Sequence, residues 1–187
     1  IKFDDTEISA LRVGDIARLG MLRTFQQTRI YSKMDCVDNM QISVSQRKGS
    51  RSTMFASRSG EIRDRAEHLL EFVGLYSKRS LISGDLSFGQ QKLLEFAMAL
   101  MNDPKVLLLD EPTAGINPTL INGLIDRLRR ANEELGITLC VIEHNMRVIM
   151  NLASNIYCLS NGKMLASGKP EDLQNDPRVI DAYLGGH

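Results

Sequence analysis

The stretch Val106-Leu107-Leu108-Leu109-Asp110-Glu111-Pro112 decides the fold of this chain. Four consecutive apolar residues are typical of a strand that is covered on both faces, as in a parallel sheet. The two carboxylates that follow are costly beside such a strand unless they are solvated, paired or bound to a metal. We therefore interpret the stretch as a central strand whose end carries chemistry.

A helix and a second strand follow. Pro118 stands at a favourable first helical position, and Gly136 ends the helical pattern. Residues 137–142 are apolar again and predict a second buried strand. Strand, helix and strand in this order predict a crossover in a parallel sheet, so we expect an α/β fold.

The second strand ends in Glu143 and His144. Ligands of parallel α/β sheets bind beyond the carboxyl ends of the strands. Asp110 is suited to orient Mg²⁺ through its water shell, and Glu111 to polarise an attacking water. His144 is suited to contact a γ-phosphate. The arrangement predicts hydrolysis of a nucleoside triphosphate.

A third motif is Ser87-Phe88-Gly89-Gln90-Gln91, which precedes an apolar helical pattern. Ser87 is a plausible N-cap, and the first turn of such a helix favours anions. Each motif also has a purely structural alternative: a cap at Ser87, a strand-ending turn at Asp110-Glu111-Pro112, and a cap around His144. For the last two motifs alone the structural alternative is stronger, but the three in order favour chemistry.

Composition sets further bounds. The chain has 187 residues, 43% hydrophobic and 25% charged, which fits one globular domain with a small subdomain. Lysine plus arginine and aspartate plus glutamate number 23 each, so bulk charge gives no argument for a nucleic-acid partner.

Cys36, Cys140 and Cys158 lack metal-type spacing. We expect Cys140 and Cys158 to lie in the core, and we expect the protein to work in a reducing compartment. We find no signal peptide and no apolar run near the ~20 residues of a membrane span.

The chain divides into three predicted regions, residues 1–31, 32–85 and 86–187. In the middle region, residues 46–60 are rich in Ser, Arg, Lys and Gly and predict a mobile, solvated loop rather than a binding patch. A helical pattern then runs to Gly74. In the last region, Asn161-Gly162 predicts a hairpin, with short helices opening at Pro170 and Pro177.

These motifs resemble those of the ATP-binding cassette (ABC) ATPases. Residues 86–90 are similar to the family's Leu-Ser-Gly-Gly-Gln signature, with Phe88 in place of the first glycine. Residues 107–111 resemble the Walker B strand, and residues 114–118 the D-loop, with Asn117 where many members have aspartate. His144 matches the switch histidine, and Gln26 the glutamine of the Q-loop.

A narrower resemblance is to the ATPase subunits of branched-chain amino acid importers. Urea importers use similar subunits, and the lipopolysaccharide-export ATPase is related. The residues that carry it lie in segments 17–20, 23–26, 142–146 and 176–185.

The resemblance implies a P-loop NTPase-like ABC core with a parallel sheet, a helical subdomain at 32–85, and a C-terminal hairpin and helices. It implies ATP and Mg²⁺ as ligands, with Glu111 as general base and His144 on the γ-phosphate. Gln26 and Asp110 would hold Mg²⁺, Asp110 through water. Ser87, Gly89 and Gln90 would contact the nucleotide of a second subunit.

Partners are implied in the same way. The family works as head-to-tail homo- or heterodimers on transmembrane permease subunits, at the cytoplasmic face of the membrane, with no nucleic acid. The helical subdomain would dock on the permease, and Gln26 would couple that contact to the site.

One family motif is absent from the 187 residues, the phosphate loop Gly-x-x-x-x-Gly-Lys-Ser/Thr. The chain begins at Ile1, inside a predicted strand, so we expect an N-terminal portion to be missing. On its own, this polypeptide should bind ATP weakly or not at all.

Two other functions stay open at this point. A soluble ABC ATPase of the DNA-repair type is disfavoured because the 60 residues between Gln26 and Ser87 are too few for a long coiled coil. One that acts on ribosomes is disfavoured because translation-type members carry two cassettes and this chain carries one. A non-catalytic module is disfavoured because Glu111 and His144 are retained.

Overall fold

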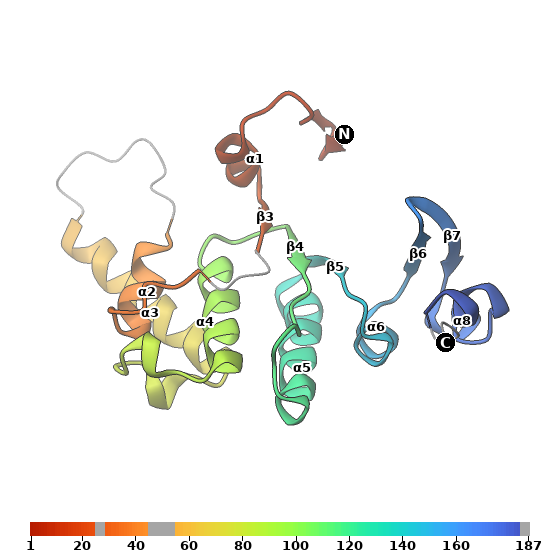
Figure 1. Cartoon of the computed structure of the whole chain (residues 1–187). Coiled ribbons are helices and arrows are strands. Elements are labelled where there is room, and N and C mark those ends of the chain that lie inside the picture. Colours follow the sequence, from red (N-terminus) through yellow and green to blue (C-terminus); the bar gives the residue numbers. More distant parts are fainter. Residues whose placement is uncertain (25–28, 45–54, 184–187) are drawn as a thin grey trace. The chain divides into compact units, whose positions relative to one another are not determined.

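The computed structural model describes residues 1–24, 29–44 and 55–183 (Figure 1). The chain forms two compact units, Ile1–Ile142 and Glu143–His187. This boundary falls inside the predicted region 86–187, and the predicted divisions at 31/32 and 85/86 stay predictions. Within the described ranges, no helix combines the length and apolarity that a membrane crossing requires.

The first unit is built on three parallel strands in the order β3 (Met21–Arg23), β4 (Val106–Asp110) and β5 (Thr138–Ile142). An antiparallel ribbon, β1 (Lys2–Phe3) and β2 (Thr6–Glu7), and helix α1 (Val13–Leu19) precede β3. The predicted α/β fold with a parallel sheet is confirmed. Because the strands are parallel, their carboxyl ends meet at one edge of the sheet.

Helix α5 (Pro118–Leu135) connects β4 to β5 and has the predicted ends. The side chain of Asn117 accepts a hydrogen bond from the Thr119 N–H at 3.0 Å, which caps the first turn. Gly136 closes the helix with a φ of +68°, a conformation that glycine adopts without strain.

Helices α2 (Cys36–Ile42), α3 (Phe55–Phe72) and α4 (Phe88–Leu100) pack on one another (Figure 1). The 3-10 turns η1 (Tyr76–Lys78) and η2 (Ser83–Asp85) join α3 to α4. The buried Ala66, Leu69 and Leu70 confirm the predicted apolar face of α3.

The predicted loop over residues 46–60 is wrong for its last part, because α3 begins at Phe55. The packed face of α3 supports the helix, and the glycine at position 60 costs it only about 1 kcal/mol. Residues 46–54 of the predicted loop lie outside the described residues.

Burial in β5 differs from the prediction. In β4, Leu107 and Leu109 are buried as expected. In β5, however, Thr138, Cys140 and Ile142 are exposed, so the predictions of a buried second strand and of a core Cys140 are wrong. An apolar run shows what a strand is able to bury, whereas the neighbouring elements decide what it does bury. Among the described strands, β5 pairs with β4 alone.

The second unit contains α6 (Met146–Leu152), β6 (Ile156–Ser160), β7 (Lys163–Gly168), α7 (Pro170–Leu173) and α8 (Pro177–Tyr183). Asn161 and Gly162 have φ values of +49° and +73° between β6 and β7, which confirms the predicted hairpin. The helices opening at Pro170 and Pro177 are confirmed too.

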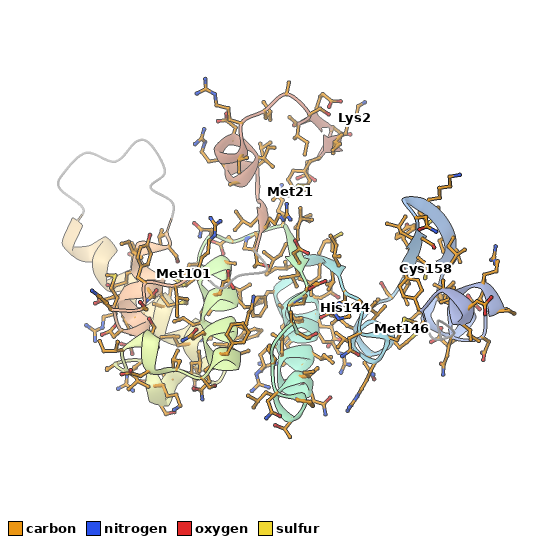
Figure 2. All side chains as sticks on the ribbon, in the orientation of Figure 1. Lys2, Met21, Met101, His144, Met146 and Cys158 are labelled. Atoms are coloured by element: carbon orange, nitrogen blue, oxygen red, sulfur yellow. The ribbon has the colours of Figure 1, made fainter. Side chains whose placement is uncertain are left out.

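A small core holds the second unit together. Cys158, labelled on β6 in Figure 2, lies in this core as predicted, and burial raises the pKa of its thiol. The buried members of the core are Ile156, Cys158, Ala166, Leu173 and Val179.

Candidate active site

The first predicted carboxylate ends strand β4. The Nη2 group of Arg23, the last residue of β3, donates to Oδ2 of Asp110 at 2.8 Å. The Asp110 side chain is 26% exposed against 57% for Arg23, so the carboxylate is the better protected partner. The pair stabilises a charge that is otherwise costly beside a buried strand. The sequence offered no direct signal for this pair, which arises because β3 and β4 are parallel neighbours.

Glu111 follows with an uncommon backbone. Its φ is +45°, which is rare for a residue with a long side chain. Its N–H donates to the Ile142 carbonyl at 2.9 Å, and its own carbonyl accepts from the Ala114 N–H at 3.0 Å. Main-chain hydrogen bonds therefore hold Glu111 from both sides. Backbones of this kind cost on the order of 1–3 kcal/mol and cluster at functional sites.

Residues 111–117 form a compact segment, here named the Glu111 turn. The Ile116 N–H donates to the Thr113 carbonyl at 3.1 Å, and Gly115 has a φ of +73°. Asn117 then caps α5. The structural alternative, a turn that ends the strand, is thus true of this segment, and it also fixes where Glu111 stands.

The signature residues open helix α4. The Ser87 N–H donates to Oε1 of Gln90 at 3.1 Å, and the Gln90 N–H donates to Oγ of Ser87 at 3.4 Å. This reciprocal capping box confirms Ser87 as the N-cap. Gly89 is buried and lies close to helix α5: a Cβ built on it would be 3.1 Å from Cδ1 of Leu120. A capped helix start that faces the beginning of α5 is a suitable place for an anion.

Glu143 and His144 belong to the second unit. Oε2 of Glu143 accepts hydrogen bonds from the N–H groups of His144 at 3.1 Å and Asn145 at 3.2 Å. The side chain of Asn145 caps α6 by accepting from the Arg147 N–H at 3.1 Å. His144, labelled in Figure 2, is exposed just before α6. The predicted cap around His144 is therefore confirmed, and its contact with a phosphate stays a prediction.

Gln26 lies outside the described residues, so its predicted role also stays a prediction. The structure brings Asp110 and Glu111 together at the end of β4. It places Ser87, Gly89 and Gln90 on one helical turn, where Gly89 abuts Leu120.

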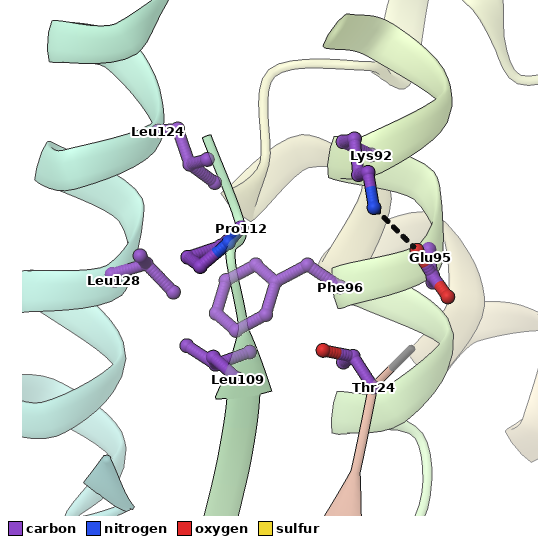
Figure 3. Close-up of a pocket in the computed structure, with 8 residues that line it drawn as sticks. All are labelled: Thr24, Lys92, Glu95, Phe96, Leu109, Pro112, Leu124 and Leu128. Atoms are coloured by element: carbon purple, nitrogen blue, oxygen red, sulfur yellow. Dashed lines mark ion pairs between the residues drawn. The ribbon is translucent and has the colours of Figure 1, made fainter. Parts of the chain in front are cut away.

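Sequence reasoning missed a buried ion pair behind the site. Figure 3 shows Lys92 and Glu95 on α4, with Nζ and Oε2 3.7 Å apart. Their side chains are only 5% and 10% exposed. Oε1 of Glu95 also accepts from the Arg29 N–H at 3.4 Å. The i, i+3 spacing of the two charges was the available signal, but their burial is a tertiary property.

The ion pair lines a cavity of about 20 Å³, room for at most one water, near the Glu111 turn. In Figure 3, Phe96 projects from α4 toward Leu109 and Pro112, which lie at the end of β4. Thr24, Leu124 and Leu128 complete the lining. The base of the Glu111 turn is therefore tightly packed.

The side chains at the end of β4 suit a magnesium ion that keeps part of its water shell better than a metal ion held by protein side chains alone. In the described part of the chain, no group of three or more His, Cys, Asp or Glu side chains could hold a metal ion. Mg²⁺ is usually bound through one or two carboxylates together with waters and substrate phosphates. Asp110 at a strand end meets that requirement.

Comparison with known proteins places the chain in a family. The model of the ABC transporter family matches residues 1–114, and that of the branched-chain amino acid ATP-binding cassette transporters matches residues 163–187. The branched-chain amino acid transport ATP-binding protein BraF of Pseudomonas aeruginosa is 34% identical over 99% of this chain and 75% of its own length. The probable LivG protein of Archaeoglobus fulgidus is 35% identical over 98% of this chain and 72% of its length.

Solved structures agree. The ADP conformation of an ATP-binding cassette of an ABC transporter superposes with a TM-score of 0.81 at 28% identity, covering 98% of this chain and 76% of that one. The chain therefore belongs to the ABC transporter family. Within it, the chain is related to the ATPase subunits of branched-chain amino acid importers, and members of this class hydrolyse ATP in the intact subunit.

Proposed function

We propose that Glu111 is the general base of ATP hydrolysis and that Asp110 holds Mg²⁺ through water. One observation carries this proposal most strongly: Glu111 follows directly on Asp110 at a parallel strand end, in a strained backbone held by Ile142 and Ala114. A carboxylate fixed in this way is suited to orient and deprotonate an attacking water.

Other predicted residues complete the proposal. Gln26 serves as a second oxygen ligand for Mg²⁺, and His144 contacts the γ-phosphate. The ion, when bound, neutralises charge that develops on the phosphates. Arg23 offers Asp110 an alternative partner at 2.8 Å, which keeps the carboxylate satisfied and at the sheet edge.

Ser87, Gly89 and Gln90 are proposed to contact the γ-phosphate of a nucleotide that a second subunit holds. The capped start of α4 supports this role, because main-chain N–H groups and the helix dipole favour anions there. The active form is then a head-to-tail dimer of two ATPase subunits.

Branched-chain amino acids are the proposed cargo, imported through transmembrane permease subunits that the ATPase binds at the cytoplasmic face of the membrane. The names of the relatives and the family match over residues 163–187 support this assignment. Uptake of labelled leucine, valine and isoleucine into proteoliposomes holding the full-length subunit and its permease tests it. Uptake of urea in place of all three amino acids would contradict it.

The substitution Glu111→Gln tests the catalytic assignment. It removes the base and preserves shape, so ATP binding persists while turnover of the full-length subunit falls by at least about 100-fold. Glu143→Gln is the matched control, because Glu143 also follows a strand yet uses its carboxylate to bind main-chain N–H groups. Wild-type turnover in Glu111→Gln would refute the assignment.

A further inference from the structure

Phe88 stands where the family signature has a glycine, and its ring contacts the Glu111 turn. A Cβ built on Gly115 would lie 2.9 Å from Cε1 of Phe88 and 3.5 Å from its Cδ1. Real Cβ atoms are not found that close to another atom, so the ring occupies the space that any side chain at 115 would need. The aromatic ring therefore lies directly against the main chain of the Glu111 turn.

The next residue, Gly89, lets the start of helix α4 approach the Glu111 turn and the start of α5 closely. Gly89 would place a Cβ 3.1 Å from Leu120 and 3.5 Å from Cγ2 of Ile116. On the next helical turn, the ammonium of Lys92 is 5.8 Å from the centroid of the Phe88 ring, within cation–π range. The Phe88 ring thus lies between Gly115 of the Glu111 turn and the buried Lys92 of helix α4.

Burial in the core does not explain why residue 88 is aromatic. Phe88 is 44% exposed, whereas the apolar core of α4 is carried by residues such as Leu94, Phe96 and Leu100, each at most 3% exposed. A half-exposed ring gains little from the hydrophobic effect compared with these residues. Its contact with Gly115 is the feature that distinguishes it.

The two elements that the ring joins are both rigid. Ser87 and Gln90 fix the start of α4 through the capping box. The hydrogen bond from the Ala114 N–H to the Glu111 carbonyl ties Gly115's neighbour to Glu111. The ring therefore lies against the residue next to Ala114, whose N–H closes the turn on Glu111.

We propose that Phe88 is a positioning residue for Glu111: its ring supports Gly115 and keeps the Glu111 turn in the geometry for hydrolysis. The proposal rests on the proposed function, in which Glu111 is the general base. It also gives the departure from the signature glycine a role, because Phe88 links the segment proposed to contact a partner's nucleotide to the chain's own catalytic turn.

The test uses four variants of the full-length subunit assembled with its permease. Phe88→Ala removes the ring and lowers kcat about tenfold, with the KM for ATP changed less than about twofold, because a small displacement of a catalytic group affects the chemical step. Phe88→Tyr keeps the ring, so its kcat should stay within about twofold of the wild-type value. Gly115→Ala pushes the ring away and also strains the backbone at a φ of +73°, so it lowers kcat at least as far.

The fourth variant combines Phe88→Ala with Gly115→Ala. The new methyl group then enters the space that the ring has left, so the loss in kcat is smaller than the product of the two single losses. Multiplicative losses overturn the proposal, as does a wild-type kcat in Phe88→Ala. If Phe88→Ala does not fold, Phe88→Leu decides, because leucine keeps apolar bulk for folding but lacks the planar ring that lies against Gly115. A wild-type kcat in Phe88→Leu then overturns the proposal.

A binding experiment separates this role from direct contact with a partner's nucleotide. In the Glu111→Gln background, Phe88→Ala should still dimerise with ATP, as measured by size-exclusion chromatography. Loss of dimerisation overturns the positioning role. The two proposals fail distinguishably: normal turnover in Glu111→Gln refutes the general base, whereas normal turnover in Phe88→Ala beside an inactive Glu111→Gln refutes only the role of Phe88.

Discussion

Two strand ends in this molecule place a glutamate ahead of a helix, and the two residues are held in opposite ways. After β4, the backbone of Glu111 is fixed by two main-chain hydrogen bonds, one donated to the Ile142 carbonyl and one accepted from the Ala114 N–H. After β5, the carboxylate of Glu143 itself fixes the backbone, by accepting from the His144 and Asn145 N–H groups. In this molecule the carboxylate of Glu143 caps the chain after β5, whereas the main chain of Glu111 is itself fixed by its neighbours after β4.

The two ends also differ in what supports them. The Glu111 turn lies against a packed cavity lined by Lys92, Glu95 and Phe96 of α4. The first residues of the second unit rely on the caps of Glu143 and Asn145. Each of the following substitutions tests one side of this difference.

The largest effect is expected for Lys92→Met. It leaves Glu95 charged and nearly buried, so the free energy of unfolding should fall by about 3 kcal/mol in urea denaturation. The double variant Lys92→Met with Glu95→Leu should recover much of that loss, because no charge remains buried at this place. Lys163→Met, at an exposed position on β7, is the control and should change stability by less than about 0.5 kcal/mol. Equal losses at positions 92 and 163 would contradict the buried pair.

The next effect is expected for Glu111→Asn. Asparagine tolerates a positive φ better than glutamate, so the free energy of unfolding should stay constant or rise by up to about 1 kcal/mol. Turnover of the full-length subunit should fall at least about 100-fold, or about 2.7 kcal/mol in activation free energy. A melting curve and an ATPase assay on one preparation measure both. A large loss of stability would show that the side chain, rather than the main chain, holds this strand end.

A smaller effect is expected for Glu143→Ala. Two N–H groups lose their acceptor, and loss of a cap costs about 1 kcal/mol. Hydrogen exchange at the His144 and Asn145 amides should accelerate more than at α8. Glu133→Ala, at an exposed position on α5, serves as control. Unchanged exchange at both amides would remove the distinction between the two glutamates.

The smallest effect is expected for Arg23→Gln. The Arg23–Asp110 pair is partly exposed, so its loss should cost only about 0.5 kcal/mol, and less at high salt. Denaturation at low and high ionic strength measures the difference in the free energy of unfolding between the wild type and Arg23→Gln. A loss that salt does not reduce would mean that Arg23 supports β3 through packing rather than charge.

Local signals predicted much of the fold. Pro118, Gly136 and the Asn161-Gly162 turn marked element ends correctly, because each restricts or frees the backbone of its own residue. Ser87 was likewise recognised as a cap from its type and position. Residues 55–60, which the composition predicts as the end of a loop, form the start of α3, because the packing of the later turns supports the helix.

The site was predictable only in part. Asp110 and Glu111 predict a functional site at the end of β4, because two acidic residues beside an apolar strand are costly unless they are solvated, paired or bound to a metal. Their partners were not predicted, since Arg23 reaches Asp110 across 87 positions of sequence. The exposure of Cys140 was missed for the same reason, because its burial depends on which elements cover β5.

Local backbone preferences and apolar patterning were enough to predict the α/β fold, several element ends and the residue types of a nucleotide hydrolase. Only the tertiary structure decided how those residues are held. The strained φ of Glu111, the burial of the Lys92–Glu95 pair and the contact of Phe88 with Gly115 all depend on neighbours that are distant in sequence. Such contacts depend on how packed elements approach one another, which no local pattern encodes.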